Sequence, residues 1–313
     1  MKAKYSNLFR FLGIILFVYI IAKIDVSELA AAFKQINLAY YFIAILFLFL
    51  SLIMRTIKWK KLINSIGTKI PVAHLLRFMA KGLFLGVITP GRLGEFWRAK
   101  YLTDHSGISH GSAFYTAFMD RLIDMLVFGL VAVAGLLIIY LRFGIEAQWQ
   151  IYLLAFIFII ILFFVFLKKL GLQRLSKLFV RFFVPASGKE KTNVFLADFD
   201  GPFKGLKLRL FLELLAYGFL YYLTAVAVYY FVALSLGINL PFWYLFLAVS
   251  MVWLILALPL TFLGLGTREA SFIYFFSILG IPAHSAVAFS LSVLLIYILS
   301  ALPGAILSIK PRH

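Results

Sequence analysis

Long apolar runs alternate with short polar segments along the whole chain. A helix needs about 20 apolar residues to cross the hydrocarbon core of a bilayer. Seven runs are predicted to span it: 8–24, 38–57, 112–141, 149–167, 207–235, 242–258 and 285–308. The pattern therefore predicts an all-α, polytopic integral membrane protein, with residues 1–313 in a single transmembrane domain.

Two further apolar segments, 72–103 and 259–280, are interrupted by residues that break helices. The breaking residues are Pro90, Gly91 and Gly94 in the first segment and Pro259, Gly264 and Gly266 in the second. Each half of these segments is too short to span alone. Open backbone at membrane depth is tolerated only where protein or a water-filled cavity surrounds it. We therefore predict two re-entrant helical hairpins beside a buried polar cavity.

The distribution of lysine and arginine predicts the orientation of these segments, because cytoplasmic loops carry an excess of both. Both ends of the chain are basic, and so is segment 168–206, in which apolar residues recur at helical spacing. This segment is predicted to be an amphipathic linker on the cytoplasmic leaflet. The alternation places both termini in the cytoplasm, for a protein of the plasma (cytoplasmic) membrane.

With this orientation, hairpin 72–103 enters from the cytoplasm and hairpin 259–280 from outside. Broken helix pairs that enter from opposite faces are typical of inverted-topology repeats. Each is followed by a full span. We therefore predict an inverted repeat with halves 38–141 and 207–308.

Composition supports the membrane class and excludes several functions. The chain is 64% hydrophobic and 13% charged, with a mean hydropathy of +1.03, whereas soluble domains are about half apolar and a quarter charged. The net charge of +18 lies in loops, so it fits orientation and attraction to anionic headgroups, and no nucleic-acid partner is expected. The absence of cysteine excludes disulfides and thiolate chemistry. Histidines lack metal-ligand spacing, so neither a metal nor a cofactor is expected.

Eight charged residues fall within or beside the predicted membrane segments. They are Arg92, Arg98, Arg121 and Arg268, with Glu95, Asp120, Asp124 and Glu269. Ionised groups at this depth cost several kcal/mol unless they are paired or hydrated. Arginine stays ionised and binds phosphate with two parallel hydrogen bonds, so the four arginines are candidate ligands for a phosphate headgroup. The four carboxylates would position them or couple transport to protons. The alternative is that all eight form purely structural ion pairs.

Four motifs resemble those of a known family. They are Thr89-Pro-Gly-Arg-Leu-Gly-Glu95, Asp120-Arg-Leu-Ile-Asp124, Gly264-Leu-Gly-Thr-Arg-Glu-Ala270 and Leu302-Pro-Gly304. Together they resemble the lysylphosphatidylglycerol synthase transmembrane region, also described as flippase-like membrane proteins of the UPF0104 type. The resemblance covers nearly the whole chain. It implies movement of modified lipids between leaflets. Some members carry a soluble aminoacyl-transferase domain, which this sequence lacks, so lysyl transfer is not implied.

The expected function is therefore a flippase for an anionic phospholipid or a polyprenyl-phosphate-linked lipid. Its partners are membrane lipids, and a second copy of the chain or a separate lipid-modifying enzyme are further candidates. An enzyme is not expected, since no nucleophile motif or donor-binding domain is evident. Two rivals stay open: a membrane transferase that uses Asp120 and Asp124 as base or metal ligands, and a lipid-binding scaffold that does not transport.

Overall fold

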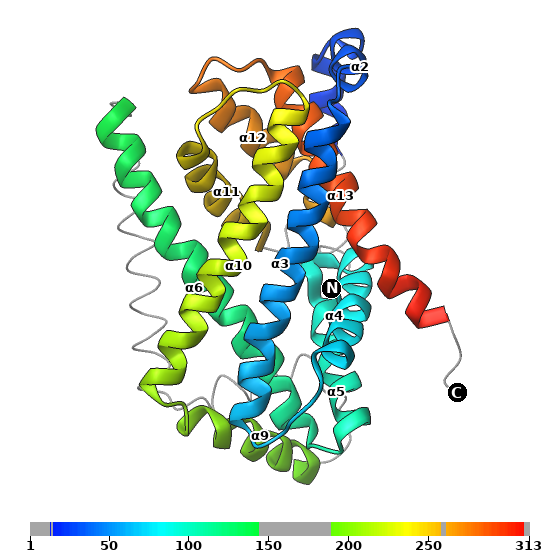
Figure 1. Cartoon of the computed structure of the whole chain (residues 1–313), viewed down its shortest axis with the longest axis vertical. Helices are drawn as coiled ribbons and strands as arrows, with labels where there is room; N and C mark the ends of the chain where they lie inside the picture. The colour runs from blue at the N-terminus through cyan, green and yellow to red at the C-terminus, as the bar shows by residue number, and fades with distance from the viewer. Residues whose placement is uncertain (1–12, 14, 144–188, 258–260, 310–313) are drawn as a thin grey trace.

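A computed structural model describes residues 13, 15–143, 189–257 and 261–309 of the chain, and every regular element within them is helical (Figure 1). Four helices are long and apolar enough to cross a membrane. They are α3 (Leu38–Ser65), α6 (His110–Phe143), α10 (Leu208–Ser235) and α13 (Ala283–Ile309). The all-helical class predicted from the apolar runs is thus confirmed for the described residues, and the four candidate spans agree with a multi-pass protein.

The number of spans is decided only in part. Predicted span 149–167 lies outside the described residues, and of span 8–24 only residues 13 and 15–24 are described, of which 15–23 are helical. Predicted span 242–258 is α11 (Phe242–Ala257), whose 16 residues are fewer than the roughly 20 of a straight span. The count of seven therefore stays a prediction. Two further helices of the described part lie outside the long helices and the broken segments: α2 (Val26–Lys34) and α9 (Lys189–Lys204), of which α9 falls within the predicted linker.

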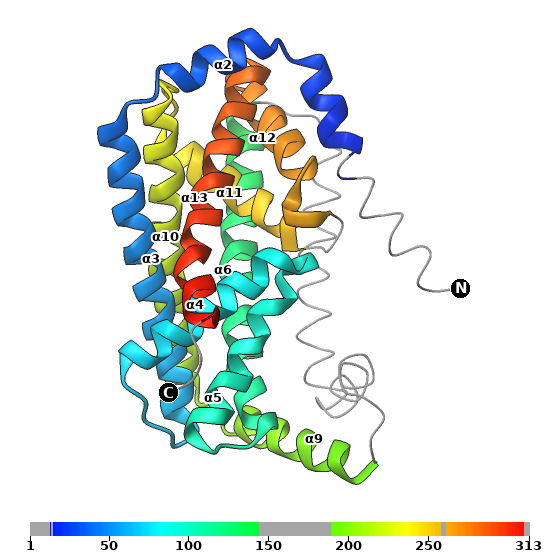
Figure 2. The same ribbon diagram turned by 90° about the vertical axis from the view of Figure 1, so that its right-hand side faces the viewer.

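Helices α3 and α10 run antiparallel, side by side, along one side of the molecule (Figures 1 and 2). Stacked rings of Phe47 and Phe231, with centroids 5.3 Å apart, join them.

Helix α3 continues eight residues beyond the predicted end at residue 57, to Ser65. No glycine or proline occurs between Leu38 and Gly67, and lysine and arginine are good helix formers. Consequently Arg55 and Lys58 lie inside the helix and are buried, and the predicted end of the span at residue 57 was too early.

The first broken segment doubles back on itself. Helix α4 (Val72–Ile88) is followed by a 3₁₀ helix, η1 (Pro90–Trp97), and by α5 (Arg98–Ser106). The rings of His74 and His105 stack with centroids 4.8 Å apart, so the two outer ends lie together. Near the turn the backbones almost touch, because a Cβ atom on Gly94 would lie 2.1 Å from the Leu85 carbonyl oxygen. The break predicted at Pro90-Gly91 is confirmed as the place where the chain reverses.

The second broken segment reverses in the same way. Helix α11 is followed by η2 (Phe262–Gly264) and α12 (Thr267–Ser277). The Tyr244 hydroxyl donates to the Phe275 carbonyl at 2.6 Å, which ties the two outer ends together. Gly264 and Gly266 have positive φ angles of 74° and 80°, a region open to glycine at little cost. Pro259 lies outside the described residues.

The tips of the two reversing segments meet at mid-height, having approached from opposite ends of the molecule (Figure 2). A small cavity between them is lined by Thr89 and Arg92 of the first segment, and by Leu263 and Gly264 of the second. Two breaks that are far apart in sequence thus form one central junction.

The stretches 38–143 and 208–309 follow the same order of elements: a long helix, a reversing pair and a second long helix. Their first turns also match. Ser65-Ile-Gly-Thr-Lys-Ile-Pro71 and Ser235-Leu-Gly-Ile-Asn-Leu-Pro241 each place the glycine at positive φ, 84° and 70°. In each turn the residue after the glycine donates its N–H to the carbonyl five residues back, a common way to end a helix.

We expect Gly304→Ala to destabilise the fold at the contact between α13 and α4. A Cβ atom at Gly304 would lie 1.9 Å from the Ala80 carbonyl oxygen, and overpacking of this kind costs about 1–3 kcal/mol. Thermal unfolding of the detergent-solubilised protein measures the loss. Gly201→Ala is the matched control, because nothing lies within 4 Å of a Cβ atom there. Equal unfolding temperatures for the two variants would contradict the close packing.

Candidate functional site

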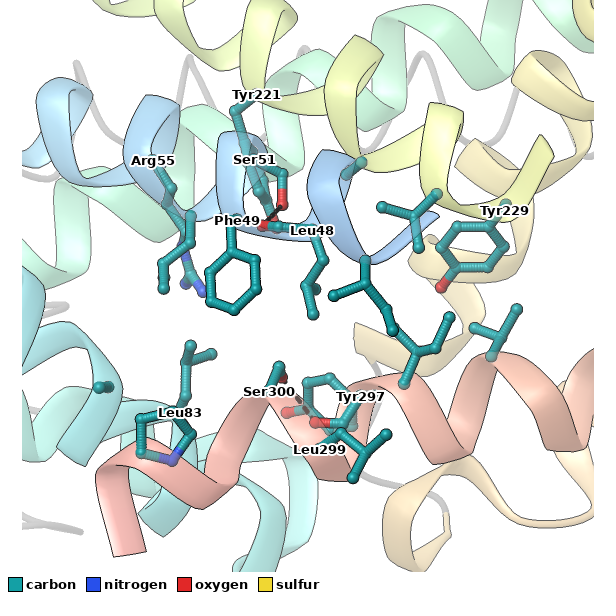
Figure 3. A pocket seen from close by; sticks show the side chains of 18 of the residues that line it. Leu48, Phe49, Ser51, Arg55, Leu83, Tyr221, Tyr229, Tyr297, Leu299 and Ser300 are labelled. Atoms are coloured by element: carbon teal, nitrogen blue, oxygen red, sulfur yellow. Dashed lines mark hydrogen bonds between the residues drawn. The ribbon is translucent and has the colours of Figure 1, made fainter. Parts of the chain in front are cut away.

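A cavity of about 280 Å³ lies between α3, α10 and α13, with α4 and η1 at its inner end (Figure 3). Most of its wall is apolar. Eight of the lining side chains can form hydrogen bonds: Ser51, Arg55, Arg92, Tyr221, Tyr229, Trp253, Tyr297 and Ser300. An apolar pocket with a few converging polar groups is the usual form of a small-molecule site.

The cavity opens sideways, between α3 and α13. Phe49 on α3 and Leu299 on α13 both line it and are 54% and 40% exposed. Figure 3 shows these two helices facing each other across the cavity. In a multi-pass protein, an exposed apolar surface on the side of the bundle faces lipid tails. The exposed side chains of Phe49 and Leu299 therefore place one side of the cavity at the lipid-facing surface of the bundle.

A network of buried ion pairs lies behind the polar end. Arg55 contacts Glu95 at 2.5 Å. Its Nε lies 3.8 and 3.9 Å from the carboxylates of Asp120 and Asp124. Lys58 bonds to both aspartates. All these side chains are at most 4% exposed, so each charge depends on its partners.

Arg98 belongs to the same network and is paired with a carboxylate within it. Its guanidinium lies 2.6 Å from Asp120 and 4.6 Å from the ring centroid of Trp59. It does not line the cavity. Of the two alternatives from the sequence, its contacts favour the structural ion pair.

Arg92 differs from every other charged residue of the network. No carboxylate of the described residues lies within 4 Å of its guanidinium, which instead stacks on Tyr297 at 4.2 Å from the ring centroid. Its backbone has a φ of +56°, a strained conformation for a residue other than glycine, at a cost of about 1–3 kcal/mol. Such strain persists where the surroundings enforce it, often at ligand sites. Arg92 is thus a cation at the cavity with no carboxylate of the described residues in ion-pair contact.

The network carries an excess of positive charge. Arg121 joins it at 3.9 Å from Glu95. The cations are Arg55, Lys58, Arg92, Arg98 and Arg121, and the carboxylates are Glu95, Asp120 and Asp124. Five cations against three carboxylates leave a formal excess of two. This corrects the balance of four and four counted from the sequence.

Arg268 and Glu269 form a separate, neutral pair. They contact each other at 2.6 Å, and both are bonded to Ser290. The other oxygen of Glu269 accepts the N–H of Gly266 at 2.7 Å, which fixes the start of α12. Neither residue lines the cavity. The structure therefore does not bring Arg268 into the cluster of Arg92 and Arg121, and its contacts favour the structural alternative.

Sequence reasoning missed Arg55, Lys58 and the three tyrosines of the cavity. The two cations are three residues apart and share a helix face, and no helix breaker separates them from the apolar run before them. That continuity was the available signal. No sequence signal marked the three tyrosines, because the chain has 16 tyrosines and 35 phenylalanines and nothing in the pattern distinguishes these three.

Comparison with known proteins identifies the family of this chain. The family model described as the lysylphosphatidylglycerol synthase transmembrane region matches residues 7–304. The chain is 30% identical over 209 residues to the UPF0104 membrane protein MJ1078 of Methanocaldococcus jannaschii, a match that covers 66% of this chain and 84% of that protein.

Two further relatives match over shorter stretches. One is MJ1595 of the same organism, at 26% identity over 129 residues, or 41% of this chain and 38% of the relative. The other is a UPF0104 membrane protein of Methanothermobacter thermautotrophicus, at 26% over 155 residues, or 49% of this chain and 46% of the relative. The matched stretches thus span less than half the length of these two relatives. The protein is a multi-pass membrane protein that belongs to the lysylphosphatidylglycerol synthase transmembrane-region and UPF0104 family.

Proposed function

We propose that this protein moves an anionic lipid between the leaflets of the membrane. The phosphate headgroup binds at Arg92 and Arg55, and the tails leave sideways between α3 and α13. One observation carries the proposal: Arg92 lacks a carboxylate partner among the described residues, and it lines a cavity open to the lipid-facing side.

The physical need for such a site follows from desolvation. A phosphate that crosses hydrocarbon unaided loses its water, for the same reason that charged side chains are costly at membrane depth. A guanidinium replaces that water with two directed hydrogen bonds. The exposed apolar residues at the mouth let the tails stay in lipid while only the headgroup enters.

The arrangement of the two halves supports alternating access. We infer that 72–106 and 242–277 are re-entrant hairpins, and that 38–143 and 208–309 form an inverted repeat. Support comes from the shared order of elements, the matching first turns and the approach of the two tips from opposite ends. Transporters of this kind bind substrate near the membrane midplane, where the halves meet. The cytoplasmic location of both termini remains part of this proposal.

The residue roles change from those expected from the sequence. Arg92 and Arg55 line the cavity and are the proposed phosphate ligands, with Arg121 nearby. Asp120 and Asp124 position the cations behind them. Proton coupling through Glu95 remains a proposal. The rival transferase gains no support, because both aspartates are buried and engaged by Lys58, and neither lines the cavity.

Blocking the cavity tests the proposal directly. Purified protein is reconstituted into liposomes that carry a fluorescent anionic phospholipid. A membrane-impermeant quencher removes the fluorescence of the outer leaflet, and the rate of the further loss measures how fast labelled lipid arrives from the inner leaflet. Ser300→Trp places a large ring in the cavity and is expected to abolish the protein-dependent rate. Ser308→Trp, on an exposed position of the same helix, should leave that rate unchanged. Equal rates with both variants, or no rate above empty liposomes, would refute a role for this cavity in transport.

A further inference from the structure

We infer that the cavity selects a lipid that ends in a phosphate monoester over one whose phosphate is a diester. This inference rests on the proposed function, because it names the headgroup class of the same site. The two classes differ in charge and in the number of free oxygens. An ionised monoester carries close to two negative charges and three terminal oxygens, whereas a diester carries one charge and two non-bridging oxygens.

Charge is the first argument. Among the described residues, five cations and three carboxylates lie together here, so the formal excess is two positive charges. Within that set, Arg92 has no ion pair and the Arg121 side chain is 16% exposed. Uncompensated charge is expensive inside a protein and in a membrane. A dianionic phosphate restores neutrality. A diester leaves one positive charge, and a zwitterionic headgroup leaves two.

Unpartnered polar atoms are the second argument. The Tyr297 hydroxyl is buried and makes no hydrogen bond with the described residues. Arg55 Nε makes none either, although it lies 3.8 and 3.9 Å from the carboxylates of Asp120 and Asp124. Arg55 and Tyr297 line the cavity, from α3 and α13. Arg92 adds its guanidinium from η1, stacked on the same Tyr297 ring. Donors from three different elements suit a group with three acceptor oxygens.

The rest of the wall is the third argument. The two serines of the cavity direct their hydroxyl protons to their own helices: Ser51 donates to the Leu48 carbonyl at 2.8 Å, and Ser300 to that of Tyr297 at 2.6 Å. Trp253 donates its ring N–H to Tyr229. Beyond the phosphate position, the mouth presents Phe49 and Leu299. Of the lining residues described, the hydroxyls of Tyr221 and Tyr229 are the further polar groups, and the mouth itself is apolar, so a small terminal phosphate with an apolar tail fits the cavity.

A binding comparison in detergent tests the inference. Phosphatidic acid and phosphatidylglycerol with identical acyl chains differ in the monoester and the diester. Polyprenyl phosphate is a second monoester with a different tail, and inorganic phosphate is a monoester-like anion without a tail. Native mass spectrometry and ligand-dependent thermal shift measure each. At pH 7.5 we expect both monoester lipids to bind at least about tenfold more tightly than phosphatidylglycerol, which equals about 1.4 kcal/mol.

Changing pH adds a second readout that needs no variant. The second pKa of a phosphate monoester is about 6, so the dianion is populated above that pH and lost below it. The preference for phosphatidic acid should therefore shrink between pH 7.5 and pH 5.5. The charged and titratable groups near the phosphate position are Arg55, Arg92, Glu95, Arg121, Tyr221, Tyr229 and Tyr297.

Removing one cation adds a third readout. Arg92→Gln lowers the charge excess to one, and the preference for phosphatidic acid should fall toward unity. Arg209→Gln removes the same charge from a side chain that is 92% exposed, and the preference should persist. Equal binding of both lipids with transport intact overturns this inference alone. Absence of both lipid binding and transport overturns the proposed function as well. Inorganic phosphate that binds as tightly as phosphatidic acid also overturns the inference, since it indicates a site for free anions.

Discussion

Arg92→Gln is expected to lower lipid transport by roughly 10- to 150-fold without lowering the unfolding temperature. The loss follows from removal of a charged hydrogen-bond donor to the headgroup, which contributes about 1.5–3 kcal/mol. The retained stability follows from the contacts of Arg92, which has no ion pair with the described residues and a strained φ of +56°. Substitution of a residue that binds ligand but does not stabilise the fold lowers activity and leaves stability unchanged or higher.

Two further substitutions at the same position separate charge from geometry. Arg92→Gly removes the charge and also relieves the positive φ, so it should unfold at the highest temperature and transport no better than Arg92→Gln. Arg92→Lys keeps the charge but loses the planar fork, so transport should lie between the wild type and Arg92→Gln. Transport is measured in proteoliposomes, and stability by thermal unfolding in detergent. If Arg92→Gln unfolds well below the wild type, Arg92 is a structural residue and the site is wrongly placed.

Asp120→Asn is expected to destabilise the protein by about 3–5 kcal/mol, the usual cost of breaking a buried ion pair by removing one partner. Asp120 contacts Arg98 at 2.6 Å, Lys58 at 3.0 Å and Arg55 at 3.8 Å, and its side chain is fully buried. Its neutralisation raises the charge excess of the network from two to three. Poor expression and a much lower unfolding temperature should result.

The matched control is Glu213→Gln, which removes a carboxylate whose partners are exposed. Glu213 lies 3.1 Å from Lys61 and 3.4 Å from Arg209, and pairs of this kind contribute about 0–1 kcal/mol. Adding Lys58→Met to Asp120→Asn removes one of the stranded cations and should recover part of the lost stability, because contacting residues are coupled. If Asp120→Asn melts no lower than Glu213→Gln, the buried network does not hold the bundle together.

The sequence was sufficient for properties that depend on local order. Apolar runs predicted the long helices, and Pro90-Gly91 and Gly264-Leu265-Gly266 predicted where two segments reverse, because helix length and helix breaking are set by neighbouring residues. The same local reasoning identified Arg92, since an arginine beside a helix breaker in an apolar segment is conspicuous by itself. The end of α3 was the exception: its span was predicted to end at residue 57, although no glycine or proline follows before Gly67.

Only the tertiary structure decided which charges meet. Arg55 and Glu95 are 40 positions apart and Lys58 and Asp124 are 66 apart, so their contacts depend on how α3, η1 and α6 pack. Arg268 and Glu269 satisfy each other locally, whereas Arg92 has no ion pair with the part of the chain that the structure describes, although both arginines follow a similar helix break. Residue type and spacing indicate that a charged side chain lies at membrane depth. Whether it is neutralised depends on the positions of distant helices, and that difference separates a structural ion pair from a ligand site.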